Sequence, residues 1–271
     1  VPKGSLCDVG VLNPIENKRS CAMSGHNKWT KIKRSKAVND TRRGKIFTQI
    51  IKEITIASKL SGGDPACNPR LRLAIEKAKE SNMPAENIKR AIQKGTGELP
   101  GVSYEDATYE AYGPNGVAII IACVTDNKNR CVQELRHILD RNHGNLGAAN
   151  SVAWMFHKKG IIHTTKSSLS EDDLLGIVLD ADADDLIRDG ETFEVTTSPE
   201  TFETVKRAME AKGVVLASAE LQLIPETTVK VEGHDAEKIL NLIEALEEHD
   251  DVQNVYSNFE MDEQTMTKLS S

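Results

Sequence analysis

The sequence predicts an α+β protein in which an N-terminal domain of three helices precedes two small α/β domains. Two observations lead to this prediction. Apolar residues recur at helical spacing as far as Lys94, after which strand-like runs alternate with amphipathic helices. The charge changes sign at the same place, because residues 24–94 hold 17 Lys and Arg against 6 Asp and Glu, whereas residues 95–271 hold 14 against 33.

The basic part predicts three helices that pack as a bundle. The first covers residues 40–60, with Ile50 and Ile54 on its apolar side and Lys45 and Lys52 on the opposite, basic side. The second begins with the capping signal Asn68-Pro69, and the third covers residues 85–94. We expect the basic side of the first helix to face outward as a stripe.

The acidic part predicts two small sheets with helices. Strands are expected at residues 104–112, 116–124, 192–196, 213–223, 227–231 and 252–259, and helices at 129–142, 169–181, 199–212 and 234–249. Residues 152–156 and 160–165 are expected to form a hairpin that turns at Lys158-Lys159. Series of this kind are typical of ferredoxin-like sandwiches, in which helices cover one face of a sheet. We expect two copies.

The uneven distribution of charge predicts a polyanionic partner. Residues 24–94 carry a net charge of +11 and residues 95–271 a net charge of -19, within a chain whose total is -7. A solvated charged face explains scattered charges, but it explains a domain of one sign poorly. The expected partner is therefore nucleic acid.

The candidate nucleic-acid ligands lie in the arm before the first helix, on that helix and on the second. They are Lys28, Trp29, Lys31, Lys33, Arg34, Lys36, Arg42, Arg43, Lys45, Lys52, Arg70 and Arg72. Lys and Arg neutralise phosphates and release counterions. Trp29 would either stack on an unpaired base or pack on the bundle. No helix-turn-helix surface with base-reading positions is evident, so sequence-specific DNA recognition is not indicated.

Patterns for catalysis and metal binding are weak. The seven histidines show no His-x-x-x-His spacing, and the five cysteines contain no Cys-x-x-Cys pair. Residues 180–191 imitate a calcium loop but carry Asp185 where that loop needs glycine, so a solvated acidic helix end is expected there. We expect no cofactor, no metal and no enzymatic activity, with a metal-independent hydrolase as a remote alternative.

Composition also bears on the location of the protein. The cysteine usage favours a reducing compartment, and no apolar run approaches the roughly 20 residues that span a bilayer, so a cytoplasmic protein without membrane contact is expected. The oligomeric state is left open, with a monomer favoured. Residues 1–22 are predicted to be a leader or non-native extension, with Met23 as the natural start. The alternative is a remnant of an import signal, which would place the protein in an organellar matrix.

Ordered strings of residues run through the chain from residue 23 to residue 260. They are MSGHNKWTKIK from Met23, RGKIF from Arg43, GGDP from Gly62, NPRLR from Asn68, YGPNG from Tyr112, TDNKNR from Thr125, GNLG from Gly144, SVAWMF from Ser151 and DDVQNVY from Asp250. In these strings the chain resembles the YebC/PmpR family, which includes the mitochondrial translational activator of cytochrome oxidase.

The resemblance implies a domain organisation and a function. It implies a helical domain at residues 23–100, a middle α/β domain at 101–155 plus 227–262, and an inserted third domain at 156–226. Family members are non-enzymatic regulators of gene expression that bind DNA or act in translation at the ribosome. We expect a ribosome-associated translation factor that binds ribosomal RNA, and the alternative is a DNA-binding transcriptional regulatory protein.

Overall fold

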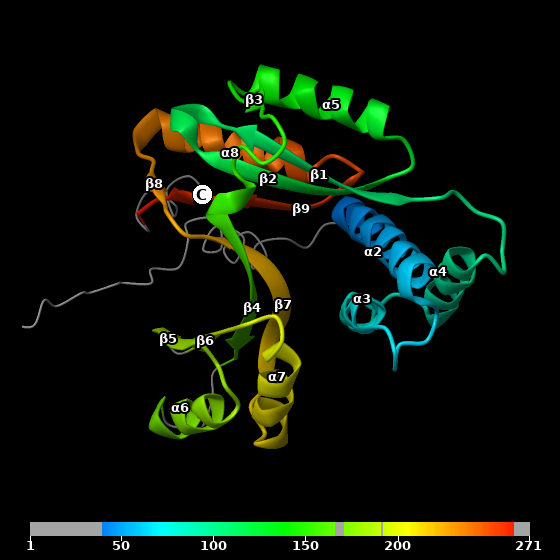
Figure 1. Ribbon diagram of the computed structural model, residues 1–271, viewed down its shortest axis with the longest axis vertical. Helices are drawn as coiled ribbons and strands as arrows, with labels where there is room; N and C mark the ends of the chain where they lie inside the picture. The colour runs from blue at the N-terminus through cyan, green and yellow to red at the C-terminus, as the bar shows by residue number, and fades with distance from the viewer. Residues whose placement is uncertain (1–39, 166–170, 191, 263–271) are drawn as a thin grey trace, which may run out of the picture.

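The computed structural model describes residues 40–165, 171–190 and 192–262, so the leader and the basic arm lie outside the described residues. The described chain forms a helical part and two sheet-containing parts (Figure 1). Each part has its own hydrophobic cluster. This arrangement confirms the predicted α+β class and the order of its parts. No helix of the described ranges is long and apolar enough to cross a membrane.

The described part of the N-terminal domain consists of α2 (Asp40–Ser61), α3 (Pro69–Glu80) and α4 (Ala85–Thr96). Their apolar sides enclose one cluster, to which the fully buried Ile54 and Leu71 belong. Asn68 caps α3, because its side-chain oxygen accepts the N–H of Leu71 at 3.1 Å. Gly95 lets α4 lie against α2, since a Cβ there would stand 2.3 Å from the carbonyl oxygen of Thr55.

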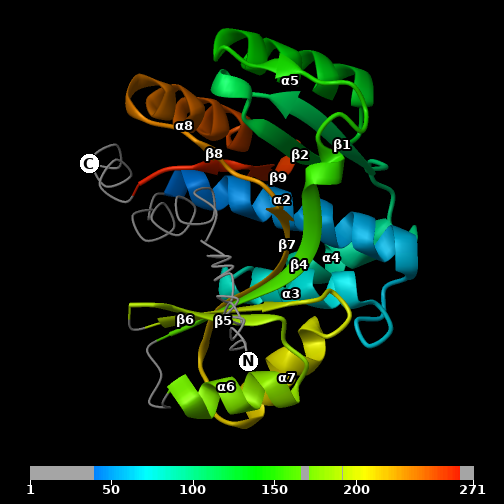
Figure 2. The ribbon, with the colours of Figure 1, turned by 60° about the vertical axis from the view of Figure 1, so that its left-hand side comes forward.

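The middle domain is a four-stranded antiparallel sheet in the order β3-β1-β2-β9. Its elements are β1 (Glu105–Tyr112), β2 (Ala118–Thr125), α5 (Lys128–Arg141), β3 (Asn145–Leu146), α8 (Gly233–Glu247) and β9 (Val252–Ser257). A separate parallel pair joins β8 (Val229–Lys230) to β10 (Phe259–Glu260). Alternation along β2 separates two faces, because Ile119 and Ile121 pack with α5 and α8 while Ile120 faces the other way. Figure 2 shows α2 along that second face.

The third domain is an antiparallel sheet in the order β5-β6-β4-β7. Its elements are β4 (Phe156–Thr164), α6 (Glu171–Asp180), β5 (Asp185–Asp189), β6 (Thr192–Thr197), α7 (Phe202–Ala211) and β7 (Leu216–Pro225). Strands β4 and β7 pair along their whole length, and this ribbon carries the chain from the middle domain to the third and back (Figure 1). Phe156 and Leu223 anchor its base by packing with Ile120 and Tyr256.

Two sequence predictions in this region are wrong. The hairpin expected around Lys158-Lys159 is one continuous strand, because β4 lies between β6 and β7 and its backbone bonds to both. Gly160, directly after these lysines, makes room for α7, since a Cβ there would lie 2.3 Å from the ring of Phe202. The expected acidic helix end contains β5, whose Leu186 pairs with Val195.

Candidate nucleic-acid interface

The polar side of α2 packs against the middle domain. The Lys52 ammonium lies 2.6 Å from Oδ1 of Asp251, and the side chain of Gln49 donates to the carbonyl of Val252 at 2.7 Å. Lys52 is only 7 % exposed. The expectation that Lys52 faces outward on a basic stripe is therefore wrong, because a carboxylate distant in sequence neutralises its charge.

Asp251 is the centre of this contact between the domains. Its second carboxylate oxygen accepts hydrogen bonds from Thr125 and Arg130, each at 2.8 Å. Burial by itself would raise the pKa of this carboxyl, but the hydrogen bonds from Lys52, Arg130 and Thr125 outweigh burial and lower the pKa to about 2. The carboxylate thus stays ionised and holds α2, β2 and α5 together.

Arg70 makes a second contact between the same domains. Its guanidinium lies 2.6 Å from Glu53 on α2 and 2.7 Å from Asp106 on β1. Both pairings are bidentate, which is the strongest geometry for this side chain. The hydrogen bonds to Asp106 and Glu53 raise the pKa of Arg70 against the opposing effect of burial. Because both edges of its guanidinium are occupied, Arg70 is a structural residue rather than a phosphate ligand.

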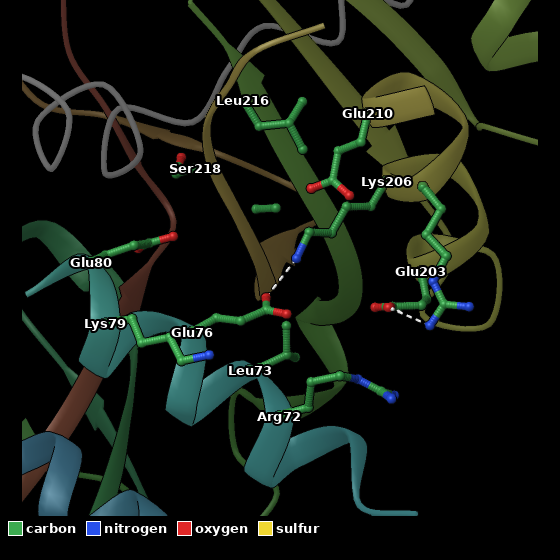
Figure 3. Close-up of a pocket in the computed structure, with 12 residues that line it drawn as sticks. Arg72, Leu73, Glu76, Lys79, Glu80, Glu203, Lys206, Glu210, Leu216 and Ser218 are labelled. Carbon is green, nitrogen blue, oxygen red and sulfur yellow. Dashed lines mark hydrogen bonds and ion pairs between the residues drawn. The ribbon is translucent and has the colours of Figure 1, made fainter. Parts of the chain in front are cut away.

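Arg72 lines a groove of about 550 Å³ between α3 and the third domain. Figure 3 shows Lys206 of α7 reaching across this groove to Glu76 of α3, at 2.6 Å. Carboxylates and cations alternate around the groove, including Glu80 and Glu210. This mixture of charges does not favour a polyanion, and the groove is best described as a contact between domains.

The structure gives less information about the remaining nucleic-acid candidates, which lie on α2 or in the arm before it. Lys45 is half-buried on α2. Arg42 and Arg43 lie in the first turn of α2, and their side chains are outside the description. The arm candidates also lie outside the described residues: Lys28, Trp29, Lys31, Lys33, Arg34 and Lys36. The structure thus brings Lys52 and Arg70 to the domain junction and does not gather the described candidates on one free surface.

Other cations of the helical domain do face solvent. Lys79 at the end of α3 and Lys89 and Lys94 on α4 are exposed. Within the described ranges none of these three makes an ion pair that would neutralise it. The sequence candidates did not include them, because exposed lysines on a helix carry no pattern that distinguishes a ligand from an ordinary solvated charge. These three residues are the described cations of α3 and α4 that remain exposed without an acidic partner.

One loop of the middle domain also exposes an aromatic side chain that the sequence predictions did not include. Trp154 is 68 % exposed, in a short 3-10 turn between β3 and β4. The buried carboxylate of Glu110 holds this loop by accepting backbone N–H bonds from Asn150, Val152 and Ala153, at 2.6 to 2.8 Å. A signal was available in the sequence, because no Asp or Glu occurs between Arg141 and Thr165.

One group of potential metal ligands occurs within the described residues, namely Glu134, His249 and Asp251. Its members are already bonded to the protein. The Nε2 atom of His249 lies 2.9 Å from Glu134, and its Nδ1 accepts the N–H of Asp251 at 3.1 Å. A cation would have to displace Lys52 and Arg130 from Asp251. This cluster is therefore better suited to fixing the domain junction than to binding a metal.

Comparison with known proteins places the chain in a family. Residues 27–98 match the TACO1/YebC N-terminal domain, and residues 104–259 match the TACO1/YebC second and third domain. A probable transcriptional regulatory protein of Chlorobium phaeobacteroides is 52 % identical over 92 % of this chain and 100 % of its own length. One of Pelotomaculum thermopropionicum is 53 % identical over 89 % of this chain and 100 % of its own length.

A solved structure agrees with these sequence matches. The crystal structure of a conserved hypothetical protein from Aquifex aeolicus has a TM-score of 0.75 and 44 % sequence identity, and the match covers 83 % of this chain and 93 % of that one. The two family models together span both the helical domain and the two sheet domains described above. This chain belongs to the TACO1/YebC family.

Proposed function

We propose that this chain is a non-enzymatic regulator of gene expression that binds nucleic acid through its basic N-terminal domain, and that its partner is ribosomal RNA. The observation that carries the proposal is the net charge of +11 on residues 24–94, against -19 on the rest of the chain. A difference of this size directs a polyanion to the helical domain and repels it from most of the remainder.

The proposed interface begins with the arm. Residues 24–39 contain four Lys and one Arg and no carboxylate. Arg42 and Arg43 follow at the start of α2, and the exposed Lys79, Lys89 and Lys94 add positive charge on α3 and α4. Lys52 and Arg70 are left out of this interface because Asp251, Glu53 and Asp106 already bind them.

The packing of α2 favours RNA over the major groove of DNA. Recognition of duplex DNA usually places the polar face of one helix in the major groove. The middle domain covers that face of α2 through Gln49 and Lys52. A basic arm that reaches phosphates and unpaired bases does not need such a face.

Co-sedimentation with ribosomes at moderate and at high salt tests the proposal. The parent protein should sediment with ribosomes at moderate salt and be released at high salt. The variant Lys31→Gln/Lys33→Gln should bind less at moderate salt, because it removes two cations of the arm. The matched control Lys212→Gln/Lys230→Gln removes two exposed cations outside the helical domain and should bind as the parent does. Equal sedimentation of both variants would contradict the proposal.

A second function is favoured by the names of the relatives, which are probable transcriptional regulatory proteins. In this alternative the basic domain binds promoter DNA. A footprint on one promoter that survives an excess of competitor DNA would support the alternative over the ribosomal function.

A further inference from the structure

We propose that Trp154 is a second nucleic-acid contact, on the middle domain, where its indole ring stacks on an unpaired base. This inference rests on the proposed function, because it assumes that the chain binds nucleic acid. It adds a site outside the basic domain and names the chemistry recognised there: a base in a single-stranded segment.

The exposure of Trp154 is unusual for its residue type. Tryptophan is on average highly buried, yet this side chain is 68 % exposed, more than any other large apolar side chain of the described residues. The neighbouring residues do not share this exposure, because Val152 and Phe156 are buried. The apolar residues beside Trp154 are thus buried or half-buried, and the loop presents one aromatic ring to the surroundings.

The loop holds the ring on a rigid support. Glu110 accepts three backbone N–H bonds from the loop, and Tyr112 donates from its hydroxyl to the carbonyl of Ser151 at 3.2 Å. The Gly147 N–H donates to the backbone carbonyl of Glu110 at 2.7 Å. A loop fixed in this way loses little conformational entropy when a partner binds.

The polar atom of the indole is already used within the loop. Its Nε1–H donates to the carbonyl of Ser151 at 3.1 Å. What remains available is the aromatic surface of the ring, which suits stacking rather than hydrogen bonding. Stacking of a base on an aromatic side chain is tolerant of sequence, because every base has an aromatic face.

The charge of the chain segment that contains Trp154 favours nucleic acid over an apolar protein surface. From Arg141 to Thr165 the chain carries Lys, Arg and His but no carboxylate, although residues 95–271 are strongly acidic as a whole. Arg141 and Lys158 are exposed and make no ion pair within the described ranges. Lys159 is paired with Asp184. A segment that combines an exposed aromatic ring with unpaired cations has the chemistry to bind a base together with its phosphates.

Oligonucleotides that differ only in their bases test this inference. The probes are a labelled 12-nucleotide oligoadenylate and a strand of the same length whose central nucleotides are abasic, so the phosphates are equal in number. Fluorescence anisotropy at two salt concentrations gives the affinities of the full-length protein. Trp154→Ala should weaken binding of oligoadenylate roughly 5- to 100-fold, whereas Trp154→Phe should retain most of the affinity. The abasic strand should bind the parent and Trp154→Ala alike, and the salt slope should not change.

The control variant is Leu179→Ala, which truncates a large apolar side chain on α6 that is 60 % exposed. It should bind both probes as the parent does. Parent-like binding of oligoadenylate by Trp154→Ala would overturn the inference while leaving the proposed function intact. An equal loss on both probes would also overturn it, since the ring would then act on the backbone or on the fold. If the parent binds neither probe nor ribosomes, the proposed function itself fails.

A protein partner for Trp154 has a distinct signature. In that case Trp154→Ala would lose sedimentation with ribosomes yet bind oligoadenylate like the parent. This outcome would overturn the stacking inference and assign the ring to a protein contact.

Discussion

The ammonium nitrogen of Lys52 lies 2.6 Å from a carboxylate oxygen of Asp251, although 199 residues separate the two in the chain. Both side chains are buried at the junction of the helical and middle domains. Desolvation offsets much of the attraction in a buried ion pair, so the pair adds little to stability relative to a well-packed apolar pair. The pair ties the two domains together at one place, because losing either partner there would leave the other as a buried charge without its opposite charge.

Removing one partner of this pair should destabilise the protein. Lys52→Met leaves the carboxylate of Asp251 with one cation fewer, and we expect a loss of roughly 3 to 5 kcal/mol in the free energy of unfolding. Urea denaturation followed by circular dichroism measures it. Lys89→Met, on the exposed side of α4, is the control and should change stability by less than about 0.5 kcal/mol. Parent-like stability of Lys52→Met would show that the domains do not depend on the pair.

The depressed pKa of Asp251 predicts a loss of stability in acid. The folded-state pKa is about 2 against an ordinary 3.8, so the unfolded chain takes up the proton first as the pH falls. The stabilisation is complete above about pH 4 and disappears as the pH falls toward 2, and it amounts to roughly 2 kcal/mol. Asp251→Asn should be less stable than the parent at pH 6, and the difference should shrink between pH 4 and pH 2. A constant difference would contradict this assignment.

Two glycines of the third domain should respond to alanine in opposite ways. Gly160→Ala places a methyl group 2.3 Å from Phe202 and from Thr197, and we expect a loss of roughly 1 to 3 kcal/mol from overpacking. Gly176→Ala lies within α6 with nothing within 4 Å of the new methyl, and it should stabilise the protein by up to about 1 kcal/mol. Thermal unfolding of the two variants compares them directly. Equal melting temperatures would disagree with the packing described for β4.

The variant Glu110→Gln tests the support of the Trp154 loop. Both carboxylate oxygens of Glu110 accept backbone N–H bonds, and the exchange replaces one oxygen by an NH2 group, which cannot accept them. At least one N–H then loses its acceptor, so we expect a loss of roughly 1 to 3 kcal/mol in the free energy of unfolding. Amide hydrogen exchange should then be faster at residues 150–153 than in the parent. Unchanged exchange at these amides would show that Glu110 does not hold the loop.

Deletion of the arm should reduce the salt dependence of nucleic-acid binding. Each cation that engages a phosphate contributes about 0.7 to 0.9 to the negative slope of log affinity against log salt concentration. Residues 24–36 carry four Lys and one Arg, so the slope should decrease by as much as about 4. Titrations of oligoadenylate at several salt concentrations give the slope. An unchanged slope would show that the arm makes no phosphate contacts.

Local patterns predicted the helices well because their signals lie within a few residues. Asn68-Pro69 marked the start of α3, and the apolar spacing around Ile54 marked the buried side of α2. The same logic failed at Lys158-Lys159, where the predicted turn is part of the continuous strand β4 and the adjacent Gly160 serves the packing of α7 on that strand. Glycine serves both turns and close packing, and the element that packs against it decides which of the two applies.

The candidate site was harder to predict because the sequence shows where a charged residue is but not which side chain lies next to it in the fold. Lys52 and Arg70 are residue types that commonly bind phosphate, yet here they form ion pairs with Asp251 and Asp106. These partners lie in another domain, one of them near the opposite end of the chain. Trp154 was missed because the exposure of an apolar residue has no local signature, and the sequence showed only that the segment around it lacks acidic residues.

Through the contacts of α3, each of the three domains is joined to both of the others. The helical domain touches the middle domain through Arg70 and Asp106, and it touches the third domain through Glu76 and Lys206. The β4–β7 ribbon joins the middle domain to the third. The ribbon alone would let the third domain bend relative to the middle domain, and the ion pair with α3 restrains that bending. A displacement of the helical domain would therefore reach the third domain along two routes, the ion pair between Glu76 and Lys206 and the β4–β7 ribbon.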